Sequence, residues 1–285
     1  HGFRGTGGRF AGARAIPLVS HSAMRNRLEP LLVLLATLAT IVANSLPNAL
    51  RLRGETTGSI SAKYPTLFTP AGYAFSIWSL IYLACLAFAV YQLLPANRED
   101  PVIATIRRPF LVSCVLNSSW IFIWQYELIF LSAVVIALLL ASLLTCYVRL
   151  DSERADRPLA FRSLVLAPIS LYAAWVTVAT IVNVAAALVS VGWQGGPLAP
   201  ASWSVVMLAV ACVLALFVAW PRRDWIFLAV VAWAVAAIAV AQSAIPSIRW
   251  VAQTVAVLLL VAAVSSIVRR SRQANRSEPK TSGSR

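Results

Sequence analysis

The chain has 285 residues, of which 60% are hydrophobic and only 12% charged, and its mean hydropathy is +0.78. Soluble globular domains carry about 25% charged residues, so the composition excludes that class. It predicts an all-α integral membrane protein whose main partner is the lipid bilayer. The net charge of +14 does not indicate nucleic-acid binding, because no basic segment is interleaved with aromatic residues that would stack on bases.

Residues 1–27 form a basic tail in which Met24 is the expected natural start. After it come apolar runs of about 20 residues, the length that crosses about 30 Å of hydrocarbon. The first is expected to be a membrane anchor; the alternative is a cleaved signal peptide, whose apolar core has about 7–15 residues. The third run is short. The eight predicted spans are Leu28–Leu46, Ala71–Leu94, Pro109–Trp124, Leu128–Val148, Leu164–Val191, Ala201–Trp220, Trp225–Ala244 and Trp250–Val268.

The basic residues predict the orientation of these spans, because Lys and Arg collect in cytoplasmic loops. With the N-terminus inside, 20 of the 24 basic residues fall on one side. Eight spans with both termini cytoplasmic are therefore favoured over any odd count. We expect a multi-pass protein of a bacterial cytoplasmic membrane, with residues 269–285 as a disordered basic cytoplasmic tail.

No metal site and no required cofactor are expected. The four cysteines fall within predicted spans without a C-x-x-C pair, and both histidines lie in the N-terminal tail. The span interiors lack charged residues, which disfavours ion pumping and proton-coupled transport. A hydrolase is disfavoured because no base stands near a span serine. Glu127 and Asp224 fall at turns and are expected to be solvated.

Three spans carry aromatic and polar residues at helical-turn spacing, which places them on one helix face. An amide in hydrocarbon also needs a partner. With alternating span directions and a rise of about 1.5 Å per residue, the three groups reach a similar depth, about 12–14 Å below the outer surface. The pattern predicts an outer-leaflet pocket for a large flat ligand, with residues 47–69 as a lid. The alternative is that these residues only pack and hydrogen-bond between helices. They are Trp78, Tyr82, Asn117, Trp120, Tyr172, Trp175, Ala179 and Asn183.

At these residues the sequence resembles the TspO/MBR family, the tryptophan-rich sensory or translocator proteins. The similar motifs are Thr69-Pro70, Trp78-Ser-Leu-Ile-Tyr82, Leu116-Asn117-Ser-Ser-Trp120 and the stretch from Tyr172 through Trp175 and Ala179 to Asn183. The resemblance implies a five-helix bundle over residues 28–191, often a homodimer, with a pocket for porphyrins and related hydrophobic ligands. The residues that it implies line or support that pocket are Trp78, Asn117, Trp120, Tyr172, Trp175, Ala179 and Asn183.

Two positions depart from the family pattern. Gly72 and Tyr73 stand where the family usually has a further Trp, and Val178 replaces an expected aromatic residue. The three-helix extension over residues 192–268 has no counterpart in short members, and no chemistry is assigned to it.

The expected function is that of a receptor or carrier with a sensory or regulatory role, which binds a tetrapyrrole (porphyrin) or a similar flat hydrophobic ligand. Two alternatives stay open: a porphyrin-degrading membrane enzyme, with Trp78, Trp120 or Trp175 as redox partners, and a small-solute transporter. The sequence leans away from an enzyme without deciding the question.

Overall fold

The computed structural model describes residues 21–50, 54–151, 157–193 and 195–277, and every regular element in these ranges is helical. The elements are α1 (His21–Ala49), α2 (Thr57–Lys63), the 3₁₀ turn η2 (Gly72–Ser76), α3 (Ile77–Tyr91), α4 (Pro95–Arg98), α5 (Pro101–Gln125), α6 (Ile129–Arg149), α7 (Leu159–Phe161), the π-helical turn η4 (Arg162–Leu166), α8 (Ala167–Ser190), α9 (Pro200–Ala219), α10 (Trp225–Ala241) and α11 (Pro246–Ser277).

Within the described residues, six helical segments are long and apolar enough to cross a membrane, so the prediction of an all-α integral membrane protein is confirmed. Two of the eight predicted spans are not among the six. Helix α10 is apolar but has only 17 residues. Helix α5 has 25 residues, but Arg107, Arg108 and Asn117 make it less apolar.

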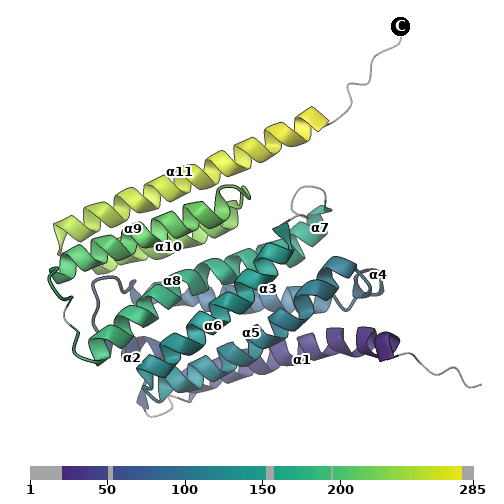
Figure 1. The fold of residues 1–285 in the computed structure, drawn as a ribbon, viewed down its shortest axis with the longest axis horizontal. Coiled ribbons are helices and arrows are strands. Elements are labelled where there is room, and N and C mark those ends of the chain that lie inside the picture. Colours follow the sequence, from purple (N-terminus) through teal and green to yellow (C-terminus); the bar gives the residue numbers. More distant parts are fainter. Residues whose placement is uncertain (1–20, 51–53, 152–156, 194, 278–285) are drawn as a thin grey trace, which may run out of the picture.

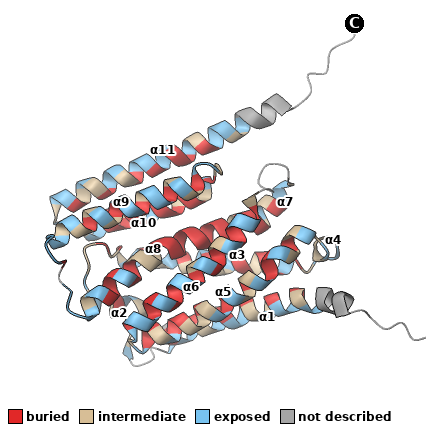
Figure 2. Cartoon of the chain, viewed as in Figure 1, coloured by how far each residue is buried: buried red, intermediate tan, exposed pale blue. Residues whose placement is uncertain are grey.

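The helices form two groups, which lie side by side in Figure 1. In the bundle, α5 packs between α1 and α6, α6 packs on α8, and α3 contacts α1 and α8. In the extension, α10 packs on α8 and is covered by α9 and α11. Helix α8 therefore lies between the two groups, and most of its residues are buried, as the red colour in Figure 2 shows. It carries half of the predicted site residues.

Several element boundaries differ from the prediction. Helix α5 starts at Pro101 rather than Pro109, because the Asp100 carboxylate accepts hydrogen bonds from the first backbone N–H groups and Pro at the first helical position is favourable. Helix α1 begins at His21, inside the segment expected to be a tail.

The predicted disorder of residues 269–285 is wrong for residues 269–277, which continue α11. Arg, Gln and Ala favour a helix, and neither Gly nor Pro interrupts this stretch before Pro279. Residues 278–285 lie outside the described residues, as do residues 1–20 of the predicted N-terminal tail.

Candidate functional site

An aromatic cluster lies where α3, α5 and α8 meet. The ring of Trp78 on α3 is its centre, with centroid distances of 5.5 Å to Tyr82, 6.1 Å to Trp120, 6.0 Å to Tyr172 and 6.3 Å to Trp175. All four distances fall in the range of favourable ring pairs, about 4.5–7 Å. The predicted convergence of the three helix faces is confirmed.

A polar chain crosses the bundle behind these rings. Asn117 on α5 is fully buried, and its Oδ1 accepts a hydrogen bond of 2.7 Å from the Asn44 amide on α1. The Asn117 amide nitrogen in turn donates to the Tyr172 hydroxyl on α8. These bonds pair polar side chains that are buried in the bundle. Asn117 and Tyr172 therefore support the aromatic wall and fix the positions of three helices.

A second amide lies nearer the end of α8. The Oδ1 of Asn183 accepts a hydrogen bond of 2.9 Å from the Ser132 hydroxyl on α6. Asn183 is 2% exposed, and Ser132 is fully buried. Asn183 also borders a small cavity among the aromatic rings, and its amide nitrogen is a hydrogen-bond donor.

A small cavity of about 30 Å³ lies among the aromatic rings. That volume is about the share of one liquid water molecule. Its walls come from α3, α5, α8, the η2 turn and the segment that covers them. The lining residues are Thr57, Ser61, Pro70, Phe75, Trp78, Trp120, Trp124, Trp175, Val178, Ala179, Val182 and Asn183.

A larger hollow of about 570 Å³ adjoins it between α1, α3 and α5. The two spaces share Thr57, Phe75, Trp78 and Trp120 in their linings, so these residues form a common wall. Ligand pockets are commonly about 300–1,000 Å³, so only the larger space has room for a ligand. Its additional polar lining comes from Asn44, Ser45, Thr56, Ser79 and Tyr82.

Two tryptophans that line the small cavity have indole N–H groups without a partner among the described residues. Trp120 and Trp175 are 5% and 2% exposed, and the Nε1 atom of each is buried without a hydrogen bond. By contrast, Trp124 Nε1 donates to the Thr57 carbonyl over 3.2 Å. A buried donor without an acceptor costs about 1–3 kcal/mol. A bound molecule that offered acceptors here would remove that cost.

The predicted residues divide into three sets. Five of the eight border the small cavity: Trp78, Trp120, Trp175, Ala179 and Asn183. Tyr82 borders the larger hollow. Asn117 and Tyr172 line neither space and lie behind the rings. Ligand contact by any of the eight stays a prediction.

Two further aromatic residues belong to the site. Trp124 stacks on Trp120 at 5.9 Å, and it follows Trp120 by four residues, so helical spacing alone would have indicated it. The Phe75 ring meets Trp175 edge-on at 6.0 Å. Phe75 lies in the η2 turn, where helical spacing does not apply. It places an aromatic ring in the wall although Gly72 stands where the family usually has Trp.

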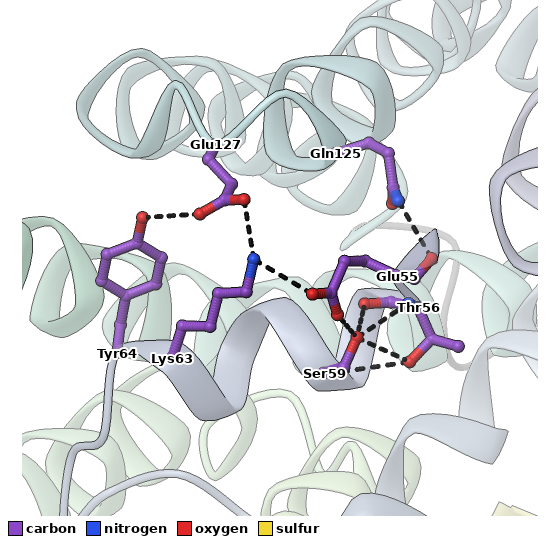
Figure 3. Close-up of polar contacts among 7 residues, drawn as sticks. All are labelled: Glu55, Thr56, Ser59, Lys63, Tyr64, Gln125 and Glu127. Atoms are coloured by element: carbon purple, nitrogen blue, oxygen red, sulfur yellow. Dashed lines mark hydrogen bonds and ion pairs between the residues drawn. The ribbon is translucent and has the colours of Figure 1, made fainter. Parts of the chain in front are cut away.

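The loop between α1 and α3 contains α2, which covers the cavity. Thr56 and Ser59 form a capping box at the start of α2. The Lys63 ammonium lies 3.1 Å from Glu55 and 2.8 Å from Glu127, which also accepts a hydrogen bond of 3.2 Å from the Tyr64 hydroxyl (Figure 3). Figure 3 also shows Gln125 donating to the Glu55 carbonyl over 3.0 Å. We call residues 54–71 the lid; the contacts of Lys63, Tyr64 and Gln125 fasten it to the turn between α5 and α6.

The charges of the lid are held in place by these contacts. The hydrogen bond from Ser59, followed by that from Lys63, lowers the pKa of Glu55. The hydrogen bonds to Glu127 and then Glu55 raise the pKa of Lys63. Burial, followed by the hydrogen bond to Glu127, raises the pKa of Tyr64.

The expectation that Glu127 is simply solvated is wrong, because the lid covers it. Its side chain is 26% exposed and accepts hydrogen bonds from two lid residues, Lys63 and Tyr64.

Two other hollows, of about 600 and 760 Å³, lie along the seams between the bundle and the extension. The first runs between α3, α8 and α10, and the second between α8, α9 and the lid. Neither is bordered by any of the eight predicted residues. The aromatic site therefore lies in the bundle itself.

The fold and this site define a multi-pass α-helical membrane protein with an aromatic cavity inside its helical bundle. The chain belongs to the family of TSPO-like proteins, whose sequence profile matches residues 30–265. The match continues beyond Val191 into α11, so the extension lies within the matched region. No curated protein and no solved structure matches the chain.

Proposed function

We propose that the protein is a membrane receptor or carrier that binds a porphyrin or a similar flat tetrapyrrole in the bundle, in a sensory or regulatory role. The observation that carries the proposal is the pair of buried indole N–H groups of Trp120 and Trp175, which lie among aromatic rings and have no partner within the described ranges. A tetrapyrrole presents a flat ring to aromatic faces. Its carboxylate substituents accept hydrogen bonds, so one molecule matches both features.

Room for this ligand comes from joining the two spaces. The small cavity holds about 30 Å³ and the adjoining hollow about 570 Å³, and Trp78 belongs to the wall between them. Trp78 is half-buried, whereas Trp120 and Trp175 are buried. We therefore assign Trp78 as the ring that shifts when the ligand enters and then packs against it. The ligand then lies between Trp120 and Trp175, with Asn44 and Tyr82 near its polar substituents.

The membrane arrangement that goes with this proposal has eight spans and both termini on the cytoplasmic side of a bacterial membrane. Helices α5 and α10 complete the count of eight. Helix α5 packs between α1 and α6, and α10 packs between α8 and α11, as expected for helices that cross the bilayer with their neighbours. At about 1.5 Å per residue, the 17 residues of α10 extend about 25 Å, close to the hydrocarbon thickness of about 30 Å.

The test is a titration of the detergent-purified protein with protoporphyrin IX, followed by tryptophan fluorescence quenching in the dark. The double variant Trp78→Leu/Trp175→Leu removes two rings of the site. The matched control is Trp225→Leu/Trp250→Leu, which removes two tryptophans that are 40% and 61% exposed at helix starts. We expect saturable quenching in the wild type and the control, and about five- to 150-fold weaker binding in the site variant, since each of the two lost ring pairs contributes about 0.5–1.5 kcal/mol.

Quenching that does not saturate, or that is equal in the wild type and the site variant, would overturn the proposal and leave the cluster as packing alone. The same samples under light test the enzymatic alternative. Loss of porphyrin absorbance that depends on Trp78 and Trp175 would replace the receptor by a porphyrin-degrading enzyme.

A further inference from the structure

The extension holds one wall of the aromatic site through a single face of α10. The backbone N–H of Ala71 donates to the Ala237 carbonyl over 3.1 Å. Two residues further on, the Tyr73 ring meets the Trp233 ring edge-on, with 5.3 Å between centroids. Trp233 and Ala237 are four residues apart and so lie on the same face of α10. Both ends of the segment Ala71–Tyr73 are thus bound to one helix of the extension.

This segment leads directly into the wall. Phe75, two residues after Tyr73, borders both the small cavity and the larger hollow and contacts the Trp175 ring at 6.0 Å. Trp78 follows within the first turn of α3. A shift of Ala71–Tyr73 along or away from α10 would therefore move two of the rings that shape the site.

Helix α10 can serve as a fixed support because its other end is bound to the bundle. Asp224, the residue that caps α10, is only 4% exposed, so the expectation that it is solvated is wrong. Its Oδ2 accepts hydrogen bonds of 2.8 Å from the Tyr147 hydroxyl on α6 and 2.6 Å from the Ser170 hydroxyl on α8. Its Oδ1 accepts from the Phe227 backbone N–H. The carboxylate thus joins three helices.

We propose that Trp233 is a positioning residue for the aromatic site, and that α10 sets the geometry of Phe75 and Trp78 by holding Ala71–Tyr73. This role rests on the proposed ligand function of the site, but the contacts themselves do not. It assigns a task to the extension. It also explains why the Tyr73 ring packs against Trp233 on α10 and does not line the small cavity.

The first measurement needs no ligand. Hydrogen–deuterium exchange of the full-length protein in detergent reports the amides of Ala71–Ser76. In Trp233→Leu we expect exchange in this segment to rise about two- to tenfold, the change that follows from loss of one ring pair. Trp233→Phe keeps an aromatic edge and should restore protection. Trp250→Leu, on the outer helix α11, is the control and should not change this segment.

The second measurement is the affinity for protoporphyrin IX. Trp233→Leu should weaken it by about two- to tenfold, while Trp233→Phe and Trp250→Leu bind like the wild type. Unchanged exchange of Ala71–Ser76 in Trp233→Leu would overturn the inference whatever the ligand result. Changed exchange with wild-type porphyrin affinity would also overturn it, because α10 would then hold the segment without positioning the site. If exchange of Ala71–Ser76 changes in Trp233→Leu but the wild type shows no saturable binding of protoporphyrin IX, the proposed ligand is wrong and the contact with α10 is not.

Discussion

Asn44 and Asn117 share a hydrogen bond of 2.7 Å at the centre of the bundle, although 73 residues separate them in the sequence. Asn117 uses its other amide atom to reach Tyr172, so α1, α5 and α8 are joined through one side chain. Polar bonds between membrane helices contribute modestly, about 1–2 kcal/mol in favourable cases. Their main effect here is to fix which faces of three helices meet behind the tryptophans.

Replacing Asn117 by Leu should lower the free energy of unfolding by about 1–2 kcal/mol. The change keeps the size of the side chain but leaves Asn44 and Tyr172 without their shared partner. Thermal unfolding of the detergent-solubilised variant checks this. Ser119→Ala is the control, since among the described residues the half-buried Ser119 donates its hydroxyl to the Val115 carbonyl of its own helix and to no other helix. Equal midpoints for the two variants would show that the amide chain does not stabilise the bundle.

Enlarging Ala179 should close the site from the side of α8. Ala179 borders the cavity of about 30 Å³, so a Leu at this position overfills it and costs about 1–3 kcal/mol of stability. Porphyrin affinity should fall at least about tenfold, because the enlarged residue occupies the space between Trp120 and Trp175. Val184→Leu adds bulk on the exposed side of the same helix and should bind like the wild type. Wild-type affinity in Ala179→Leu would place the ligand elsewhere.

The convergence of the aromatic cluster could be predicted because helical spacing and alternating span direction fix both the face and the depth of a residue. Trp78, Trp120 and Trp175 meet as that argument requires. The same reasoning could not distinguish lining residues from supporting ones. Asn117 and Tyr172 lie behind the rings because their hydrogen bonds hold them there, and those partners come from other helices.

Helix α2 of the lid and the burial of the Asp224 carboxylate could not be predicted from the sequence either, because both depend on contacts with other helices. Helix α2 has seven residues, too few to be stable alone, and it depends on its cap and its contacts with Gln125 and Glu127. From the sequence alone, Asp224 is expected to be a solvated turn residue, because its hydrogen bonds with Tyr147 and Ser170 come from distant helices. In both cases the structure follows from contacts between residues far apart in the chain.

The lid should stay closed over a wide pH range. The pKa of Glu55 lies below its ordinary value of 4.5, so its stabilising contribution is complete above that value and is lost as the pH falls through the lowered pKa. The pKa of Lys63 is raised above 10.5, so its contribution is complete below that value and is lost as the pH rises through the raised pKa. A spin label on Ala62→Cys should show constant mobility from about pH 5 to pH 10 and greater mobility beyond both limits.

Lys63→Gln in the same labelled protein removes both ion pairs. Mobility at neutral pH should rise slightly, because exposed ion pairs contribute little, and the remaining contacts of Gln125 and Trp124 still hold the lid. In the labelled protein that keeps Lys63, a steep change in label mobility between about pH 6 and pH 8 would contradict this account, since neither Glu55 nor Lys63 changes charge there.

The hydroxyl of Tyr147 should matter for the attachment of the extension. Tyr147→Phe leaves the Asp224 carboxylate with one donor fewer in a buried position, and such a loss costs about 1–3 kcal/mol. We expect a lower thermal midpoint and faster exchange of the α10 amides next to Asp224, because the cap of that helix is weakened. Tyr91→Phe is the matched control, as the Tyr91 hydroxyl donates to no described residue. If both variants unfold at the wild-type temperature with unchanged α10 exchange, Asp224 does not fasten the extension, and the other contacts of α8 and of Ala71–Tyr73 with the extension join the two groups of helices.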